Sequence, residues 1–200
     1  MLAPGLWMPA SIMARLGARL AKAGYAPRVF AYRGRSPLEA NVERLARFAR
    51  EAFGDAAAHY VGFSLGGLLV LEMLNRHPEI PAASVVLLGA PVRGSLAGRR
   101  LGARRLGRWM LGASAPLWEE RRARWTRTTP LGVIAGTYPF GLGRMVGRLP
   151  DANDGVVRVV ETGVDGMTAV ALIKRAHSLL PLSGAVGALI EHFIARGRFA

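Results

Sequence analysis

The strongest constraint on the fold is a regular alternation of short apolar runs with longer segments whose apolar residues recur at helical spacing. Within the first 90 residues, the predicted helices span 9–23, 37–53 and 64–77, with Ser36 as the expected cap of the second. The predicted strands span 27–32, 57–63 and 83–89. Such alternation predicts an α/β fold with a mostly parallel sheet. The run 83–89 is apolar on both faces, as in a sheet that helices cover on both sides.

The chain then continues with a segment of different character before the sheet pattern returns. Residues 93–127 hold ten arginines but only two acidic residues, together with three of the four tryptophans, and we expect an inserted helical segment there. The later elements are strands at 131–138 and 167–174, a polar loop at 139–155 and a helix at 182–195. A length of 200 residues suits one domain. We therefore expect a single domain over residues 1–200 with a basic insertion at about 93–127.

The net charge of +14 limits the kinds of partner that the chain can bind. The sequence holds 27 basic and 13 acidic residues, and every basic residue except Lys22 and Lys174 is an arginine. Such a surface can attract nucleic acid, anionic lipid or acidic proteins, or the arginines can simply keep the chain in solution. Because no nucleic-acid-binding motif and no basic strand with interleaved aromatic residues occurs, we expect no nucleic-acid partner.

The lack of cysteine excludes disulfides, thiolate metal sites and a cysteine nucleophile. No uninterrupted apolar run reaches the roughly 18 residues of a membrane-spanning helix. The start MLAPGLWMPA lacks the basic region and apolar stretch of a signal peptide. We therefore expect a cytoplasmic protein.

The motif with the clearest chemistry is GFSLGG at 62–67, which fits the pattern G-x-S-x-G. It follows a predicted strand and opens a predicted helix, the setting in which this pattern forms a sharp nucleophile turn. Gly62 and Gly66 allow strand and helix to approach closely, and the turn exposes the hydroxyl of Ser64. The N–H of Leu65 then points to where an oxyanion would form. A glycine-rich turn without chemistry is the alternative that the pattern alone leaves open.

A nucleophilic serine needs a base and an acid, and in this setting the chain order is serine, acid, histidine. His177 follows the last predicted strand in the loop RAHSLLP, where a histidine would reach the carboxyl edge of the sheet. The other three histidines suit the role less well: His59 precedes the serine, His77 ends a helix and His192 lies within the final helix. The sequence therefore favours His177 as the base, against a loop histidine with no role.

The acid is expected in the segment DANDGVV at 151–157. Asp154 precedes Gly155 in a turn that can hold the carboxylate, and the two valines that follow can enclose it. Asp151 and Asp165 are the alternatives, although Asp165 lies nearer the start of the final strand. The sequence favours Asp154, against a turn aspartate that bonds only its own backbone.

A second donor to an oxyanion should come from a loop after an early strand. The segment PGLWM at 4–8 is the one candidate, because it lies before the first predicted helix. Either Leu6 or Trp7 would donate its N–H there. Together with Phe63 and Leu65, these two side chains also suggest an apolar acyl pocket around the serine.

Several segments in this order resemble the small bacterial lipase- and esterase-like serine hydrolases of the α/β-hydrolase superfamily. The segments are APGLW at 3–7, GFSLGG at 62–67, LLGAPVRGS at 87–95, NDGVV at 153–157 and HS at 177–178. The resemblance covers most of the chain and implies a three-layer α/β-hydrolase fold. It also implies hydrolysis of a carboxylic ester, in a small molecule or a lipid, through an acyl-serine intermediate. Ser64, Asp154 and His177 would be the triad, with no metal or organic cofactor.

The sequence departs from the family pattern at three places. Phe63 stands where the family has a histidine before the serine, and this change leaves the serine itself unaffected. Pro4 replaces the histidine of the family's H-G pair, which puts the shape of the oxyanion loop in question. Only MLA represents the strand before that loop, so this strand is either very short or incomplete. Since the first two strands of the usual sheet are absent as well, we expect about six strands.

The resemblance also places residues 93–127 where such enzymes carry a cap or lid. The arginines and tryptophans of this segment suit an interfacial helix that meets an anionic membrane surface or covers the pocket. The alternative is a solvated basic face packed onto the domain. There are two functional alternatives. One is an acyltransferase or thioesterase with the same triad, and the other is a non-catalytic binding protein of this fold.

Overall fold

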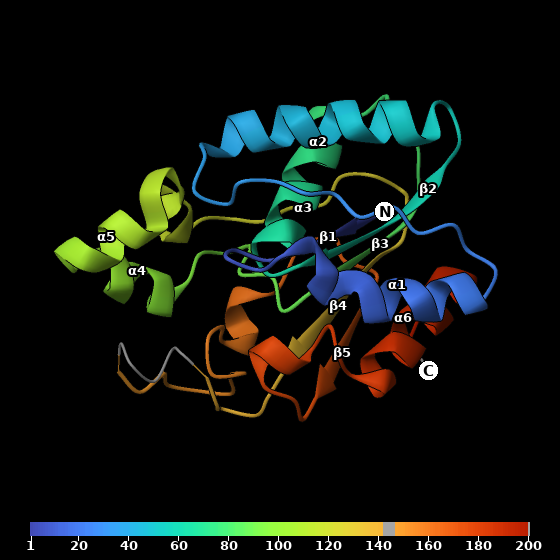
Figure 1. Ribbon diagram of the computed structural model, residues 1–200. Coiled ribbons are helices and arrows are strands. Elements are labelled where there is room, and N and C mark those ends of the chain that lie inside the picture. Colours follow the sequence, from blue (N-terminus) through green and yellow to red (C-terminus); the bar gives the residue numbers. More distant parts are fainter. Residues whose placement is uncertain (142–146, 200) are drawn as a thin grey trace.

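The computed structural model describes residues 1–141 and 147–199, and within them a parallel β-sheet carries helices on both faces (Figure 1). The five strands are β1 (Leu2–Ala3), β2 (Ala58–Phe63), β3 (Ala82–Leu88), β4 (Leu131–Gly136) and β5 (Ala169–Ile173). They pair in the order of the chain, and every pair is parallel. The predicted α/β fold is therefore confirmed.

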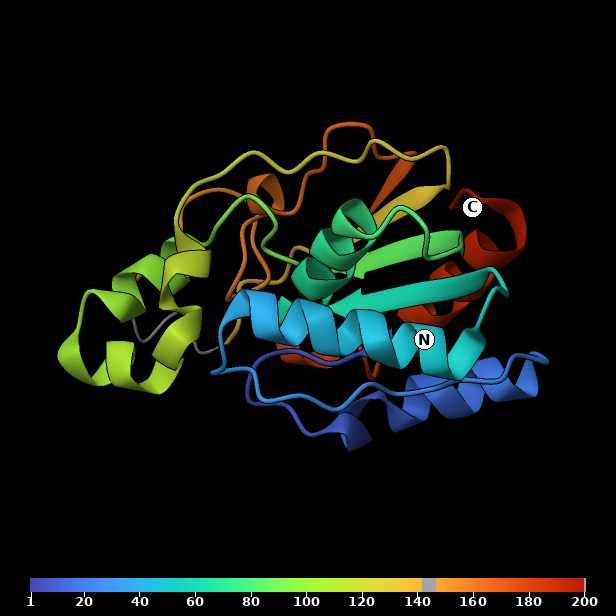
Figure 2. The ribbon, with the colours of Figure 1, turned by 90° about the horizontal axis from the view of Figure 1, so that it is seen from above.

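Four helices form the two outer layers (Figures 1 and 2). One face of the sheet is covered by α2 (Leu38–Phe53) and α3 (Leu65–Arg76), and the other by α1 (Ala14–Lys22) and α6 (Gly184–Arg196). A 3-10 turn at Ala10–Met13 precedes α1. All four helices lie where apolar residues at helical spacing predicted them.

The central strand β3 shows how both faces of the sheet are buried. Val85 and Leu87 belong to the apolar cluster that includes α2 and α3, whereas Val86 and Leu88 belong to the cluster that includes α1 and α6. Neighbouring residues of a strand point to opposite faces. A strand that is apolar at successive positions is therefore what a sheet between two helical layers requires.

The sheet is close to the expected size of about six strands, and the difference lies at residues 27–32. This segment forms only an isolated bridge, between Val29 and Leu2. The Leu2 N–H donates to the Arg28 carbonyl at 2.8 Å, and the Phe30 N–H donates to the Leu2 carbonyl at 2.9 Å. A strand can pair only as far as its neighbour extends, and β1 has just two residues. Pro27 also lacks an N–H, so the ladder cannot begin at the predicted residue.

The start of α2 also differs from the prediction. Its N-cap is Pro37, in an extended conformation, and no side chain caps the helix. The N–H of Ser36 donates instead to the carbonyl of Arg33 at 3.0 Å. Ser36 therefore closes a turn one residue before the cap position, and the cap predicted from the sequence was wrong.

The inserted segment leaves the sheet after β3 and lies at one end of the molecule (Figures 1 and 2). Its helices are α4 (Leu96–Gly102), α5 (Arg105–Leu111) and a 3-10 helix at Gly112–Trp118. The chain then returns to β4, and the loop predicted at 139–155 follows, of which residues 142–146 lie outside the described part. None of the helices within the described residues is both long and apolar enough to cross a lipid bilayer.

Candidate active site

Ser64 occupies the turn between β2 and α3, at the carboxyl edge of the sheet. Its backbone has a positive φ of 53°, with ψ at −123°, a region that residues other than glycine enter only under constraint. The Ser64 N–H donates to the carbonyl of Leu88 at 2.9 Å, and the Ser64 carbonyl accepts the N–H of Gly67 at 2.9 Å. The serine is thus held at a constrained strand-to-helix turn, the setting that the G-x-S-x-G pattern requires.

Two glycines of the motif are required by close approach of the backbone. A β-carbon on Gly62 would overlap the Cα of Gly67, so this glycine lets β2 and α3 meet. A β-carbon on Gly66 would overlap the carbonyl oxygens of Ala3 and Pro4, so this glycine lets α3 lie against the end of β1. The two glycines therefore place Ser64 at a close contact between β2 and α3, and also beside the loop that follows β1.

Ser64, His177 and Asp154 form a chain of hydrogen bonds, although they lie far apart in the sequence. His177 Nε2 lies 3.0 Å from Ser64 Oγ, and His177 Nδ1 lies 2.7 Å from Asp154 Oδ2. All three residues are buried. Because a carboxylate can only accept, Nδ1 carries the proton and Nε2 is left to accept from the serine hydroxyl. In this tautomer a histidine can remove a proton from serine.

The Asp154 carboxylate is held by the turn that follows it. Its Oδ1 accepts the N–H groups of Val156 at 3.0 Å and Val157 at 2.7 Å, which leaves Oδ2 for His177. The backbone of the same turn also reaches the histidine, because the His177 N–H donates to the Asp154 carbonyl at 2.9 Å. Carboxylate and imidazole are therefore fixed relative to each other by both side chain and main chain.

Phe63 packs against the imidazole of His177. The two ring centroids lie 4.9 Å apart with an angle of 37° between the ring planes, and Phe63 is fully buried. The phenyl ring limits the orientations that the imidazole can adopt. In the sequence, Phe63 stands out only as a departure from the family pattern and as part of an apolar surrounding. No local spacing could have indicated its contact with residue 177.

The loop expected to supply a second oxyanion donor lies directly beside the serine. Residues 5–8 form a turn in which the Met8 N–H donates to the Gly5 carbonyl at 3.3 Å and Trp7 has a φ of 58°. A β-carbon on Gly5 would come within 3.0 Å of the Ser64 Cβ, so the turn packs against the serine without space for a side chain.

Three backbone N–H groups beside the serine are available as donors. Leu65 is the first residue of α3, where an N–H has no partner within its own helix. Leu6 and Trp7 line the same cavity as Ser64. Within the part of the chain that the structure describes, none of the three N–H groups donates a hydrogen bond. They are the groups that the sequence predicted as donors.

An apolar cavity of about 380 Å³ opens beside Ser64 and His177. Part of its wall comes from the turn at 5–8 and from the valines that follow Asp154. Another part comes from the inserted segment, which contributes Leu101, Met110 and Trp118 among others. This volume lies within the usual range for small-molecule sites. The cavity therefore joins the reactive side chains to a surface that suits an apolar chain.

The other three histidines lie outside this chain of hydrogen bonds. His59, on β2, bonds the hydroxyl of Ser84 at 2.8 Å, and burial lowers the pKa of its imidazole. His77 is the C-terminal cap residue of α3, and its ring lies 3.1 Å from a carboxylate oxygen of Glu43. His192 lies within α6. These three histidines therefore lie in the elements where the sequence placed them, and the sequence favoured none of them as the base.

The two alternative aspartates have other surroundings. Asp165 forms an ion pair with Arg93, and Asp151 lies 3.8 Å from Arg158 at the surface. Neither is hydrogen-bonded to His177 in the described structure. Among the described residues, no group of three or more histidine, aspartate or glutamate side chains could hold a metal ion.

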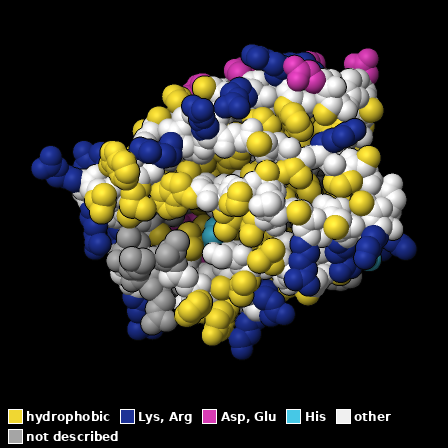
Figure 3. Space-filling model, in the orientation of Figure 1, with side chains coloured by type: hydrophobic (Ala, Val, Ile, Leu, Met, Phe, Trp, Pro, Cys, Tyr) yellow, Lys and Arg dark blue, Asp and Glu magenta, His cyan; other side chains and the backbone are white. Residues whose placement is uncertain are grey.

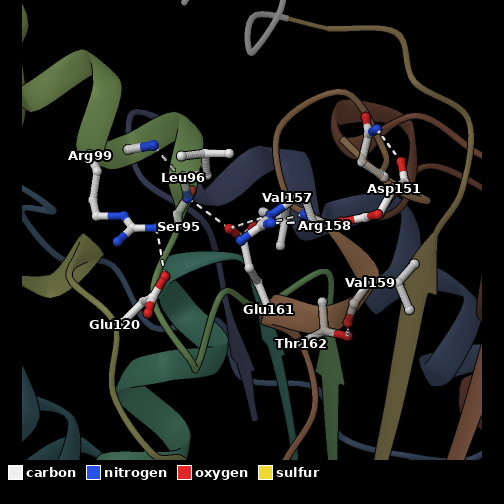
Figure 4. A network of polar contacts seen from close by, with 12 residues as sticks. Ser95, Leu96, Arg99, Glu120, Asp151, Val157, Arg158, Val159, Glu161 and Thr162 are labelled. Atoms are coloured by element: carbon white, nitrogen blue, oxygen red, sulfur yellow. Dashed lines mark hydrogen bonds and ion pairs between the residues drawn. The ribbon is translucent and has the colours of Figure 1, made fainter. Parts of the chain in front are cut away.

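Glu161 is a buried carboxylate that sequence reasoning missed (Figure 4). Its Oε1 accepts the N–H of Leu96, the first residue of α4, at 2.7 Å, and the Nε of Arg158 at 3.0 Å. Its Oε2 accepts the backbone N–H of Arg158 at 2.8 Å. Glu161 therefore ties the chain that follows Asp154 to the base of the inserted segment. The one signal in the sequence was a glutamate three residues after a helix cap, and arginine is an unusual cap.

We expect Glu161→Ala to lower the free energy of unfolding by about 3 kcal/mol, because the Arg158 guanidinium and the Leu96 N–H lose a buried acceptor. Urea denaturation followed by circular dichroism measures this loss. Glu120→Ala is the matched control, since Glu120 is an exposed carboxylate that pairs with Arg99 at 2.8 Å and should contribute little. Equal losses in the two variants would contradict the role given to Glu161.

Comparisons with known proteins agree with this architecture. A family model described as the alpha/beta hydrolase fold matches residues 34–128. The mature lipase BlEst2 of Bacillus licheniformis has a TM-score of 0.73 and 18% identity over 98% of this chain and 90% of that one. A metagenomic carboxyl esterase has a TM-score of 0.64 and 18% identity over 98% and 73% of the two chains. A search of curated proteins found no match.

A third solved structure is the phospholipase PlaB of Legionella pneumophila, with a TM-score of 0.59 and 16% identity over 82% of this chain and 45% of that one. At such identities these likenesses show the fold alone. They agree with the family model and with a parallel sheet whose strand-to-helix turn carries Ser64. The three-layer α/β-hydrolase fold expected from the sequence is thereby confirmed.

Proposed function

We propose that the protein hydrolyses carboxylic esters through an acyl-serine intermediate. The observation that carries the proposal is the chain of hydrogen bonds from Ser64 through His177 to Asp154, which lies at an apolar cavity. A serine bonded in this way to a histidine and a buried acid is an activated nucleophile. The similar folds of a lipase, a carboxyl esterase and a phospholipase support the choice of an ester as substrate.

In the first half-reaction the hydroxyl of Ser64 attacks the ester carbonyl while His177 Nε2 takes its proton. The separation of 3.0 Å between Oγ and Nε2 suits that transfer. Asp154, 2.7 Å from Nδ1, stabilises the positive charge that develops on the imidazole. His177 then gives the proton to the leaving alcohol, and the acyl group remains on the serine.

In the second half-reaction, water takes the place of the alcohol. His177 removes a proton from the water as it attacks the acyl carbonyl, and the imidazole then returns this proton to the oxygen of Ser64. A carboxylic acid leaves, and the serine hydroxyl is restored. The scheme uses three side chains and water.

The negative oxygen of each tetrahedral intermediate would be bound by backbone N–H groups. Leu65 supplies one donor at the start of α3, and Leu6 or Trp7 supplies the second from the turn at 5–8. These groups make no hydrogen bond within the described residues, so the oxyanion would displace no protein acceptor from them. One donor of this kind contributes on the order of 10²-fold in rate.

In this proposal, residues 93–127 are the cap of the acyl site. The support is that α4, α5 and the 3-10 helix after them all line the cavity. A β-carbon on Gly98 would overlap the indole of Trp118, so α4 and the 3-10 helix are packed closely together. An acyl chain would lie between these helices and the turn at 5–8.

A fluorophosphonate probe tests the proposal, because it reacts with activated serines. We expect covalent labelling at Ser64, located by mass spectrometry of the modified peptide. p-Nitrophenyl esters of increasing acyl length should then be hydrolysed, with a higher kcat/KM for medium-length acyl groups than for acetate, because the cavity is apolar. A protein that is neither labelled nor active would overturn the proposal and leave a binding protein of this fold.

Two related activities use the same three side chains and differ in leaving group or acceptor. Faster turnover of an acyl thioester than of the matching oxygen ester would assign a thioesterase. Accumulation of a new ester on addition of an alcohol, in place of free acid, would assign an acyltransferase. Either result keeps the acyl-serine and overturns ester hydrolysis as the main activity.

A further inference from the structure

Large apolar side chains are exposed at the cavity, on α5 and on the turn at 5–8. Leu106 and Trp109 are 68% and 67% exposed, and they lie three positions apart, on one side of the helix. Trp7 is 49% exposed and lines the same cavity as Leu106. Figure 3 shows hydrophobic side chains gathered over the end of the molecule where α4 and α5 lie, and over the adjoining centre of the face in view. A group of this kind marks an interaction surface, unlike single exposed residues.

Three arginines lie on α5 or at its N-cap, next to these apolar side chains. Arg104 and Arg105 stand at the start of α5, and Arg108 lies one turn further on. Among the described residues, none of the three takes part in an ion pair. The sequence holds no acidic residue over 80–118. Positive charge is therefore uncompensated next to the exposed apolar side chains.

Trp109 is held in its exposed position by the loop before α2. The guanidinium of Arg35 lies 5.0 Å from the centre of the Trp109 ring and donates to the Trp109 carbonyl at 2.6 Å. The carbonyl of Arg35 in turn accepts the N–H of Ala113 at 3.0 Å. The exposed indole is therefore part of a surface that is already formed, so docking would not have to order it.

We propose that this surface, made of Trp7, Leu106, Trp109, Arg105 and Arg108 and here named the α5 surface, docks on an anionic lipid membrane. The apolar side chains would enter the boundary between headgroups and acyl chains, and the guanidinium groups would bind lipid phosphates. Tryptophan suits that boundary because its ring is apolar while its N–H is polar. Docking would turn the cavity toward the lipid, since Trp7 and Leu106 line it.

Vesicle flotation tests the proposal, with Ser64→Ala as the protein so that no lipid is hydrolysed. The two probes are vesicles of phosphatidylcholine alone and vesicles of phosphatidylcholine mixed with phosphatidylglycerol. We expect flotation with the anionic vesicles, little with the neutral ones, and progressive loss of binding as salt is added. Equal binding to both kinds of vesicle, or binding to neither, would overturn the proposal.

Charge reversal shows whether the α5 surface itself makes the contact. Arg105→Glu with Arg108→Glu should weaken binding to anionic vesicles by at least about 20-fold, because each arginine near such a surface contributes about five-fold. The matched control is Arg44→Glu with Arg47→Glu, which changes two exposed arginines of α2. Equal losses in both pairs would show attraction by net charge alone and would contradict a specific docking surface.

The apolar part of the contact has its own control. Trp109→Ser should weaken binding by about ten-fold, since a buried aromatic side chain is lost from the lipid boundary. Leu172→Ser removes a similarly exposed side chain, 59% exposed on β5, and should bind as before. Arg105 and Arg108 are not among the residues that line the cavity. Hydrolysis of a short, water-soluble ester by the arginine-reversed protein with Ser64 intact should therefore be unchanged. Loss of docking and loss of the proposed ester hydrolysis are thereby measured separately.

Discussion

Replacement of Ser64 by alanine is expected to lower kcat for ester hydrolysis by roughly 10⁵- to 10⁶-fold. The change removes the nucleophilic oxygen but leaves the 2.7 Å bond between His177 and Asp154 and the lining of the cavity in place. Alanine meets the same constraint at a φ of 53° as serine does, so the fold should persist. Initial rates with a p-nitrophenyl ester and thermal unfolding by circular dichroism measure the two effects.

Ser11→Ala is the matched control for this substitution, because Ser11 is an exposed serine in the 3-10 turn before α1. It should retain the full rate. If the Ser64→Ala protein still turned over ester at a rate near that of the unmodified protein, the acyl-serine mechanism would be wrong. A variant that was inactive because it failed to fold would show itself in the unfolding curve.

Asp154→Asn is expected to lower kcat/KM by about 10⁴-fold near neutral pH. The N–H groups of Val156 and Val157 require an oxygen on the side that faces them, so the asparagine would turn its NH₂ toward His177. Nδ1 would then have to accept a hydrogen bond, and the proton would move to Nε2. A protonated Nε2 cannot take the proton of Ser64, so the base is lost although the side chain keeps its shape.

The two other aspartates near this region provide the controls, since both were candidates for the acid in the sequence. Asp151→Asn and Asp165→Asn change side chains that lie near Arg158 and Arg93 and make no bond to His177 within the described structure. Both should retain most of the activity in the same steady-state assay. A larger loss at either position than at Asp154 would reassign the acid.

The central part of the fold could be predicted from hydrophobic pattern because most residues of β2 and β3 are buried. β2 and β3 are apolar on both faces, and the helices beside them repeat apolar residues at helical spacing. Prediction was weaker where pairing depends on a neighbour. The segment 27–32 has the composition of a strand, but its neighbour β1 offers two residues and leaves it a single bridge at Val29.

In the site, too, residues close together in the sequence could be predicted more fully than contacts between distant residues. The turn at Ser64 could be predicted because its strand, serine and glycines lie within a few residues of one another. The structure brings His177 and Asp154 to this serine, as the order of the three along the chain suggested. The contacts of Phe63 with His177 and of Glu161 with Leu96 join residues far apart, and no spacing in the sequence encodes such a pair.

The position of Glu161 has a consequence for attempts to change what this protein accepts. The Glu161 carboxylate accepts backbone N–H groups from both the first residue of α4 and Arg158. Arg158 directly follows Val157, whose N–H donates to Asp154. The base of α4 and this turn should therefore open and close as a single cooperative unit. Substitutions in α5 should leave the contact between α4 and the turn after Asp154 intact. Exchange of residues 93–96 would instead disturb Asp154 together with the pocket.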